Sequence, residues 1–279
     1  IHMTGMKKRS HTQTLLIVMV IISIAAGLAA FIFLDVGTAK KDVAENDTYK
    51  IRHTYTDSYK MTDIVEEYNT EKEGQRYSYL KYQLDHIIKE AILLKVEVPS
   101  PAQTVTLPAK LGNYPVIQIG MEEIEQPDHN ERIAVKDKQE IDTIVIPEGV
   151  KRIGSDTFYK GNIREVFLPQ SVRSIGSRTF AYSTVQIVHV KNKRTDFSTK
   201  CFADSSLEKI ELPDGYRVTF GRGCFDRTLI REILWPVEEW EGDSLPYCMF
   251  RDCKELTTVK FPNGQDCISI PEDCFYGCE

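Results

Sequence analysis

The sequence predicts a β-rich solenoid, a parallel sheet with short turns or helical pieces on its other side, preceded by a single N-terminal transmembrane helix. Phenylalanines recur at spacings of 22, 22, 23, 25 and 25 residues, beginning at Phe158. A short apolar segment, usually ending at a proline, precedes them. A fixed period in the twenties is typical of solenoids. Residues 15–34 carry no charge, and a run of this length can cross a bilayer as a helix.

The composition is that of a globular protein. Of the 279 residues, 42% are hydrophobic and 27% are charged, which excludes wholesale disorder. Lys and Arg number 35 and Asp and Glu number 41, so the formal net charge is -6. Phosphate binding needs a basic face, so nucleic acid is not expected to be a partner.

Residues 1–34 are predicted to form a targeting segment and a membrane anchor. Residues 1–14 are interpreted as a cloning scar followed by a cytoplasmic basic tail, and 15–34 as a transmembrane signal anchor. Positive charge stays on the cytoplasmic side, so the rest of the chain is expected outside the cell membrane. A cleaved signal peptide, with small residues at 37–39, is the competing interpretation. The run exceeds the roughly 7–15 residues usual for such peptides, which favours the anchor.

Residues 35–76 are predicted to form a polar stalk, because the segment is rich in Lys, Glu, Asp and Thr and poor in aliphatic residues. Within it, a short helix is expected over residues 62–68, with Thr62 and Asp63 as caps.

Residues 77–140 are predicted to hold a capping hairpin, a first repeat and a charged insertion at 125–140. The segment 77–98 fits both helical spacing and strand alternation. Its apolar, β-branched end before Pro99 favours the hairpin over a helix.

From residue 141 to 279 the copies share one pattern. Each apolar segment has apolar residues at offsets 0, 3 and 5, as in Ile163, Val166 and Leu168. We expect these strands to stack about 4.8 Å apart as parallel rungs, because none can bury its inner face alone. An Ile-Gly pair such as Ile153-Gly154 predicts an inward anchor followed by a tight turn. The recurring phenylalanines predict an aromatic spine: Phe158, Phe180, Phe202, Phe225, Phe250 and Phe275.

The copies IPEGVKRIGSDTF at 146–158 and LPQSVRSIGSRTF at 168–180 resemble the BspA-like (Treponema-type) leucine-rich repeats. Their consensus is roughly LxxIxLPxSVxxIGxxAFxxC. The segment TVTLPAKLGNYPVIQIG at 104–120 resembles the family's first repeat. The resemblance covers about residues 77–279. It implies a leucine-rich-repeat solenoid on a bacterial surface, with roles in adhesion and protein binding. The last copy stops before its next strand, so we expect either further repeats or a partner to cover this end.

The pattern of cysteines and histidines indicates neither a metal site nor a catalytic site. Cys201 and Cys224 share one repeat position, which would bring them near disulfide range on stacked rungs. A column of buried thiols in place of alanine is the favoured interpretation. The spacing from Cys248 to Cys253 follows the repeat phase, so no metal site is expected. No catalytic or phosphate-binding motif is present, so neither a cofactor nor enzymatic activity is expected.

The outward residues at offsets 2 and 4 form the predicted binding site. Neighbouring rungs would bring together Thr143, Val145, Glu165, Phe167, Ile187 and His189. Exposed apolar patches usually mark partners, and solenoids offer such faces for binding. The sequence therefore predicts a non-catalytic cell-surface module that binds a protein or peptide ligand, for adhesion or recognition. A structural or assembly role in a bacterial cell-envelope complex is the alternative.

Overall fold

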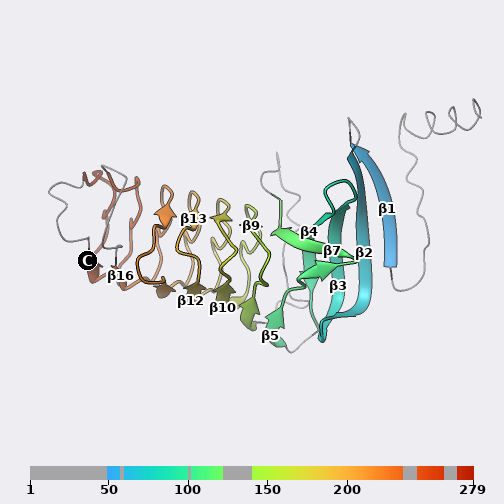
Figure 1. Ribbon diagram of the computed structural model, residues 1–279. Helices are drawn as coiled ribbons and strands as arrows, with labels where there is room; N and C mark the ends of the chain where they lie inside the picture. The colour runs from blue at the N-terminus through green and yellow to red at the C-terminus, as the bar shows by residue number, and fades with distance from the viewer. Residues whose placement is uncertain (1–48, 57–59, 100–101, 122–139, 235–243, 261–268) are drawn as a thin grey trace, which may run out of the picture. The chain divides into compact units, whose positions relative to one another are not determined.

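A computed structural model describes residues 49–56, 60–99, 102–121, 140–234, 244–260 and 269–279 (Figure 1). These residues form strands and turns, and they fall within one compact unit, residues 42–279. Within the described ranges there is no helix of the length and apolarity needed to cross a membrane. The anchor expected at 15–34 lies outside these ranges.

The first four strands form an antiparallel sheet in chain order. They are β1 (Tyr49–Thr56), β2 (Lys60–Lys72), β3 (Gln75–Asp85) and β4 (Glu90–Glu97). Strands β3 and β4 form a hairpin where the sequence predicts one, but it does not open the sheet, because β1 and β2 precede it. Alternation along it buries Leu80 and Leu93 completely, which is why the strand pattern outweighed the helical one.

The helix predicted over residues 62–68 is wrong, because this segment lies within β2. Residues 60–76, expected to belong to the polar stalk, form β2 and the start of β3. Val65 pairs with Tyr82, and both side chains are 4% exposed. Among the described side chains of β2 only Thr62 and Val65 are buried, so the composition of the strand stays polar. Pairing along β3 decides the structure here and overrides local propensity.

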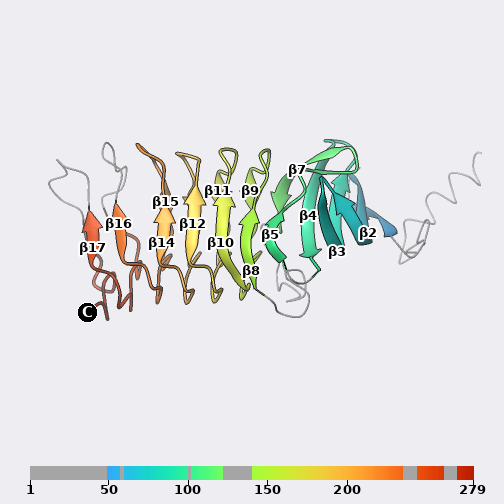
Figure 2. The ribbon, with the colours of Figure 1, turned by 90° about the horizontal axis from the view of Figure 1, so that it is seen from below.

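Each repeat that follows forms one rung, and each rung from β8 to β15 contributes one strand to each of two sheets, in which neighbouring rungs pair in parallel (Figure 2). The five-stranded sheet contains β5 (Ala102–Thr106), β8 (Ile141–Val145), β10 (Ile163–Leu168), β12 (Ile187–Val190) and β14 (Lys209–Glu211). Short strands on the opposite side extend the antiparallel sheet through the parallel pair β4–β7 into a ten-stranded sheet. They are β7 (Tyr114–Ile119), β9 (Arg152–Ile153), β11 (Ser174–Ile175), β13 (Asp196–Phe197) and β15 (Thr219–Phe220).

Two further elements complete the described fold. The short strand β6 (Lys110–Leu111) pairs with β7, and β16 (Glu232–Leu234) pairs with β17 (Thr258–Lys260) in a separate two-stranded sheet. The prediction of a β-solenoid is confirmed. Besides the predicted turns, the rungs carry a second row of strands opposite the five-stranded sheet, most of them two residues long, and no helical pieces occur in the described residues.

The core lies between the two sheets and along the phenylalanine turns. The inward positions of β10, occupied by Ile163, Val166 and Leu168, are at most 2% exposed. The predicted aromatic spine is confirmed, because the rings of Phe158, Phe180, Phe202, Phe225, Phe250 and Phe275 stack with centroids 5.1, 5.4, 5.7, 5.6 and 5.3 Å apart. Each of the four inner rings therefore buries one face against the phenylalanine of the rung before it and the other against that of the rung after it.

The glycine of the Ile-Gly pair serves close approach between rungs. A Cβ on Gly154 would lie 2.1 Å from the Met121 carbonyl oxygen, and one on Gly176 would lie 2.4 Å from the Ser155 nitrogen. Neither glycine has a positive φ, whereas Asp156 and Arg178, two residues later, do. The tight turn thus begins after the glycine, and the glycine lets the rungs pack.

Candidate protein-binding face

The six residues of the predicted site lie together on the outer surface of the five-stranded sheet. Parallel pairing aligns Thr143 with Glu165 and Glu165 with Ile187, in one row across β8, β10 and β12. A second row aligns Val145 with Phe167 and Phe167 with His189. All six side chains are partly buried. The face is therefore built by the rung register, as the repeat period predicts, and its residues are fixed by the sheet beneath them.

His189 holds the centre of this face. Its Nδ1 lies 2.6 Å from Oε2 of Glu211, and its Nε2 lies 2.6 Å from Oε1 of Glu165. Each ring nitrogen of His189 therefore lies within hydrogen-bond distance of a carboxylate oxygen, one from the preceding rung and one from the following rung. Its ring also stacks on Phe167, with centroids 4.0 Å apart and an interplanar angle of 7°. Three neighbouring strands are thus tied together by one side chain.

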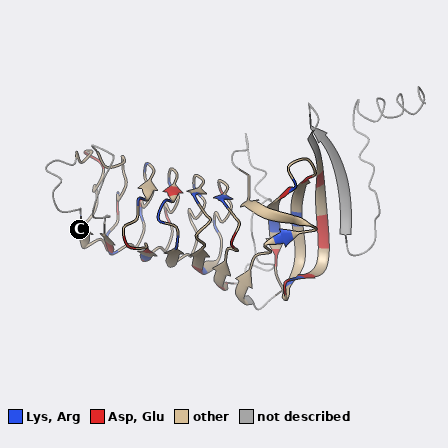
Figure 3. Ribbon diagram, in the orientation of Figure 1, with Lys and Arg blue, Asp and Glu red and all other residues tan. Residues whose placement is uncertain are grey.

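A further ion pair lies beside this cluster on β14, the last strand of the five-stranded sheet. Lys209 donates a hydrogen bond to Glu211 at 2.7 Å. This bond, with a smaller contribution from His189, lowers the pKa of Glu211 below its ordinary value. The same contact raises the pKa of Lys209. Positive and negative residues are interspersed along the rungs (Figure 3).

The prediction of an exposed apolar patch therefore captures only part of this face. It placed Val145, Phe167 and Ile187 correctly side by side, but it did not include Glu211. The signal was available, since Glu211 follows His189 by the repeat spacing of 22 residues. Two carboxylates and an imidazole beside the apolar side chains of Val145, Phe167 and Ile187 give a mixed surface, which can recognise both the shape and the charge of a ligand.

Among the described residues, no cluster of side chains is arranged for catalysis or for metal binding. No group of three His, Cys, Asp or Glu side chains within the described ranges is placed to hold a metal ion. The six described cysteines are free thiols, and Cys201, Cys224 and Cys274 are fully buried, which confirms the favoured interpretation of a buried column. Burial raises the pKa of the Cys201 thiol, and the neighbouring Cys224 adds to this effect. Buried neutral thiols of this kind are poor nucleophiles.

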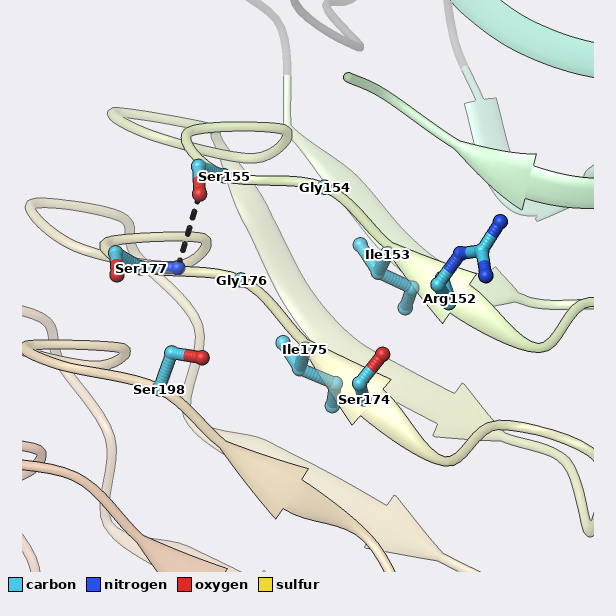
Figure 4. Close-up of a pocket in the computed structure, with 9 residues that line it drawn as sticks. All are labelled: Arg152, Ile153, Gly154, Ser155, Ser174, Ile175, Gly176, Ser177 and Ser198. Atoms are coloured by element: carbon cyan, nitrogen blue, oxygen red, sulfur yellow. Dashed lines mark hydrogen bonds between the residues drawn. The ribbon is translucent and has the colours of Figure 1, made fainter. Parts of the chain in front are cut away.

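A shallow depression of about 200 Å³ follows the glycine column across β9 and β11 (Figure 4). Its polar lining consists of Arg152 and four serines, Ser155, Ser174, Ser177 and Ser198. The backbone nitrogen of Ser177 donates to the Ser155 hydroxyl at 3.1 Å. No acid–base pair lines it, so its geometry gives no means of proton transfer.

Comparisons with known proteins agree with the repeat architecture. Residues 131–248 and 240–279 match a family model described as "BspA type Leucine rich repeat region", in six copies. No curated protein matches the chain.

Three solved structures are similar at low identity. A leucine-rich cell surface protein from Faecalibacterium prausnitzii A2-165 is 19% identical, with a TM-score of 0.40, over 64% of this chain and 52% of that one. The chain thus spans about half the length of that protein. The pneumococcal vaccine antigen PcpA is 14% identical (TM-score 0.40; 81% of this chain, 71% of that one). A leucine-rich repeat protein from Bacteroides ovatus ATCC 8483 is 15% identical (TM-score 0.31; 71% and 79%).

The family match covers more than half of the chain, and the stacked rungs, buried strand positions and phenylalanine spine follow the same repeat. The chain therefore belongs to the BspA-type leucine-rich repeat family.

Proposed function

We propose that the chain is a non-catalytic recognition module that binds a protein partner through the outer surface of its five-stranded sheet, at the outer side of a membrane. The family supports the general role, because solenoids use continuous sheet faces for protein binding. The residues of the binding site are Thr143, Val145, Glu165, Phe167, Ile187 and His189, extended by Glu211.

The observation that carries this proposal is the stack of Phe167 on His189 between two carboxylates. Aromatic side chains dominate binding energy when they are held rigidly at the centre of an interface. Here the ring loses little freedom on binding, because its neighbour already fixes it. The surrounding Glu165 and Glu211 would select a partner with complementary positive groups.

The membrane placement rests on the sequence alone. Residues 15–34 would anchor the chain, and the basic tail before them would stay inside. Protease treatment of intact cells that produce the full chain tests this part. Cleavage within residues 42–279 without cell lysis supports external display. Protection of these residues until the cells are lysed contradicts it.

The binding face is tested with the full chain and two variants that introduce the same charge. Phe167→Glu alters the centre of the face, whereas Leu229→Glu alters a side chain that is 44% exposed and outside the site. Each purified protein is immobilised and exposed to host extracellular-matrix proteins and to a bacterial envelope extract. Circular dichroism and thermal melting verify that both variants are folded.

Loss of a specific partner on Phe167→Glu, with retention on Leu229→Glu, supports the proposal. Equal capture by the folded Phe167→Glu variant contradicts it. The source of the partner separates the two roles: a matrix protein favours adhesion, and an envelope protein favours a structural or assembly role.

A further inference from the structure

Within the described strands of the repeats, the backbone hydrogen bonds between rungs are interrupted between β14 and β16. In other rungs the residue after the first apolar position donates its N–H to the preceding rung. Gln186 donates to the Arg164 carbonyl at 2.8 Å, Glu208 to Gln186 at 2.9 Å, and Thr257 to Arg231 at 2.9 Å. The corresponding bond from Arg231 to Glu208 is absent, and β14 and β16 belong to different sheets.

The interruption affects the five-stranded sheet but spares the phenylalanine turns. Along the turns, Phe225 still donates to the Met249 carbonyl at 3.0 Å and stacks on Phe250. The two rungs are therefore joined at one edge and separated at their strands. Figure 2 shows β14 and β16 set farther apart than β12 and β14.

Tyr216 occupies this gap. It follows Pro213 by three residues, as Val150 follows Pro147 and Val172 follows Pro169, so a bulkier side chain replaces a valine. Its hydroxyl donates to the Leu234 carbonyl on β16, and the residue is 7% exposed. Burial raises the pKa of the Tyr216 phenol, so the hydroxyl remains a donor at neutral pH. A single side-chain bond thus stands where a ladder of backbone bonds joins other rungs.

Apolar groups are exposed beside the gap. Ile210 and Leu212 are partly buried, whereas Val188 and Val190, at the same positions one rung earlier, are 0% and 5% exposed. On the other side Leu234 is 50% exposed. We call the set formed by β14, β16 and Tyr216 the seam. It combines two parallel strand edges with an apolar border, which is the chemistry that an extended polypeptide satisfies.

We infer that the seam is a strand-insertion site: an extended segment of a protein partner displaces Tyr216 and pairs with the facing edges of β14 and β16. This inference rests on the proposed function and adds the form in which a partner is recognised. The inserted segment would supply backbone N–H and carbonyl groups to both edges, and its inward side chains would cover Ile210. Backbone pairing gives affinity, and alternate side chains give specificity.

A peptide with the sequence of the chain's own residues 207–212, LEKIEL, is a suitable probe because this sequence already forms a rung in this sheet. The matched control is the same peptide with alternate backbone nitrogens methylated, which keeps the side chains and removes donors. Amide hydrogen exchange of the full chain in detergent micelles is followed by NMR. With LEKIEL, exchange at residues 209–212 and 232–234 should slow by about fivefold or more. The methylated peptide should leave it unchanged.

Two variants test the role of the tyrosine. Tyr216→Phe removes the bond to Leu234 and should tighten LEKIEL binding by about fivefold, because one hydrogen bond no longer opposes opening. Tyr182→Phe removes a hydroxyl from an exposed tyrosine outside the seam and should leave the affinity unchanged. Unchanged exchange at the seam, equal protection by the methylated peptide, or protection confined to the edge strand β1 would each overturn the inference.

The outcomes also separate the seam from the proposed face. If LEKIEL protects the seam while Phe167→Glu leaves partner capture intact, the seam stands and the proposed face fails. If LEKIEL has no effect while Phe167→Glu abolishes capture, the face stands and strand insertion fails.

Discussion

Phe167 and His189 lie on neighbouring strands with their rings 4.0 Å apart and nearly parallel. This contact orients the imidazole so that one nitrogen meets Glu165 and the other meets Glu211. A repeat of 22 residues therefore does more than stack a core. It also places one aromatic ring, one imidazole and two carboxylates on adjacent strands, where isolated segments could not hold them.

Removal of a ring from the spine should be costly. Phe202 is fully buried between Phe180 and Phe225, so Phe202→Ala should lower the free energy of unfolding by about 4 kcal/mol. Leu229→Ala, at a side chain that is 44% exposed, should change it by less than about 0.5 kcal/mol. Urea denaturation measures both. Equal losses for the two variants would count against a continuous spine.

A methyl group in the glycine column should force rungs apart. In Gly176→Ala the new Cβ would meet backbone atoms of the preceding rung at 2.4 Å, so a loss of about 2–3 kcal/mol is expected. Ser198 stands at the same position one rung later and already carries a Cβ. Ser198→Ala should therefore be nearly neutral in the same thermal and urea melts. A neutral Gly176→Ala would contradict the close approach.

The carboxylate of Asp226 is fully buried and depends on two arginines. Arg251 donates two hydrogen bonds to it, at 3.1 and 2.6 Å, and Arg227 donates a third at 3.1 Å. Arg251→Met should cost about 3 kcal/mol, because it leaves a buried charge poorly paired. The exposed pair Arg164–Asp142 is the control, and Arg164→Met should cost about 0–1 kcal/mol. The reverse order in urea denaturation would refute this assignment.

Acid should weaken one link between rungs. Arg227 donates hydrogen bonds of 2.5 and 2.7 Å to Asp204, and this contact lowers the pKa of Asp204 below 3.8. A carboxyl whose pKa is lowered by folding stabilises the folded state at any pH above its pKa in the unfolded chain. This contribution is lost as the pH falls through its pKa in the folded chain. The stability advantage of the native chain over Asp204→Asn should thus be full at neutral pH and shrink below 3.8. An advantage that grows in acid would be inconsistent with this ion pair.

The buried thiols should resist alkylation. Burial raises the pKa of Cys253 and of Cys274 to about 11, so little thiolate forms at pH 8. Cys278 is less buried, and its pKa is also raised by burial. Iodoacetamide followed by peptide mass analysis should modify Cys278 first, and the other two only after unfolding in guanidinium. Rapid modification of Cys253 in the folded chain would argue against its burial.

Much of the solenoid could be predicted because the repeat is visible in the amino-acid sequence as a regular spacing of apolar residues. The inward positions Val166 and Leu168 follow from alternation, and the stacking of Phe158 on Phe180 follows from a constant period. The second sheet was missed because strands as short as Arg152–Ile153 have too few residues to show alternation. The polar strand β2 was missed for a related reason, since its pairing with β3 is a long-range property.

The sequence by itself determined the rung, its inward residues and the phenylalanine that closes it, because these depend on local alternation and on a fixed spacing. Only the tertiary structure decided how His189 is shared between two carboxylates, and where the ladder breaks at Tyr216. Both depend on distances between side chains of different rungs. A linear pattern of apolar residues carries no such distances, and three-dimensional packing sets them.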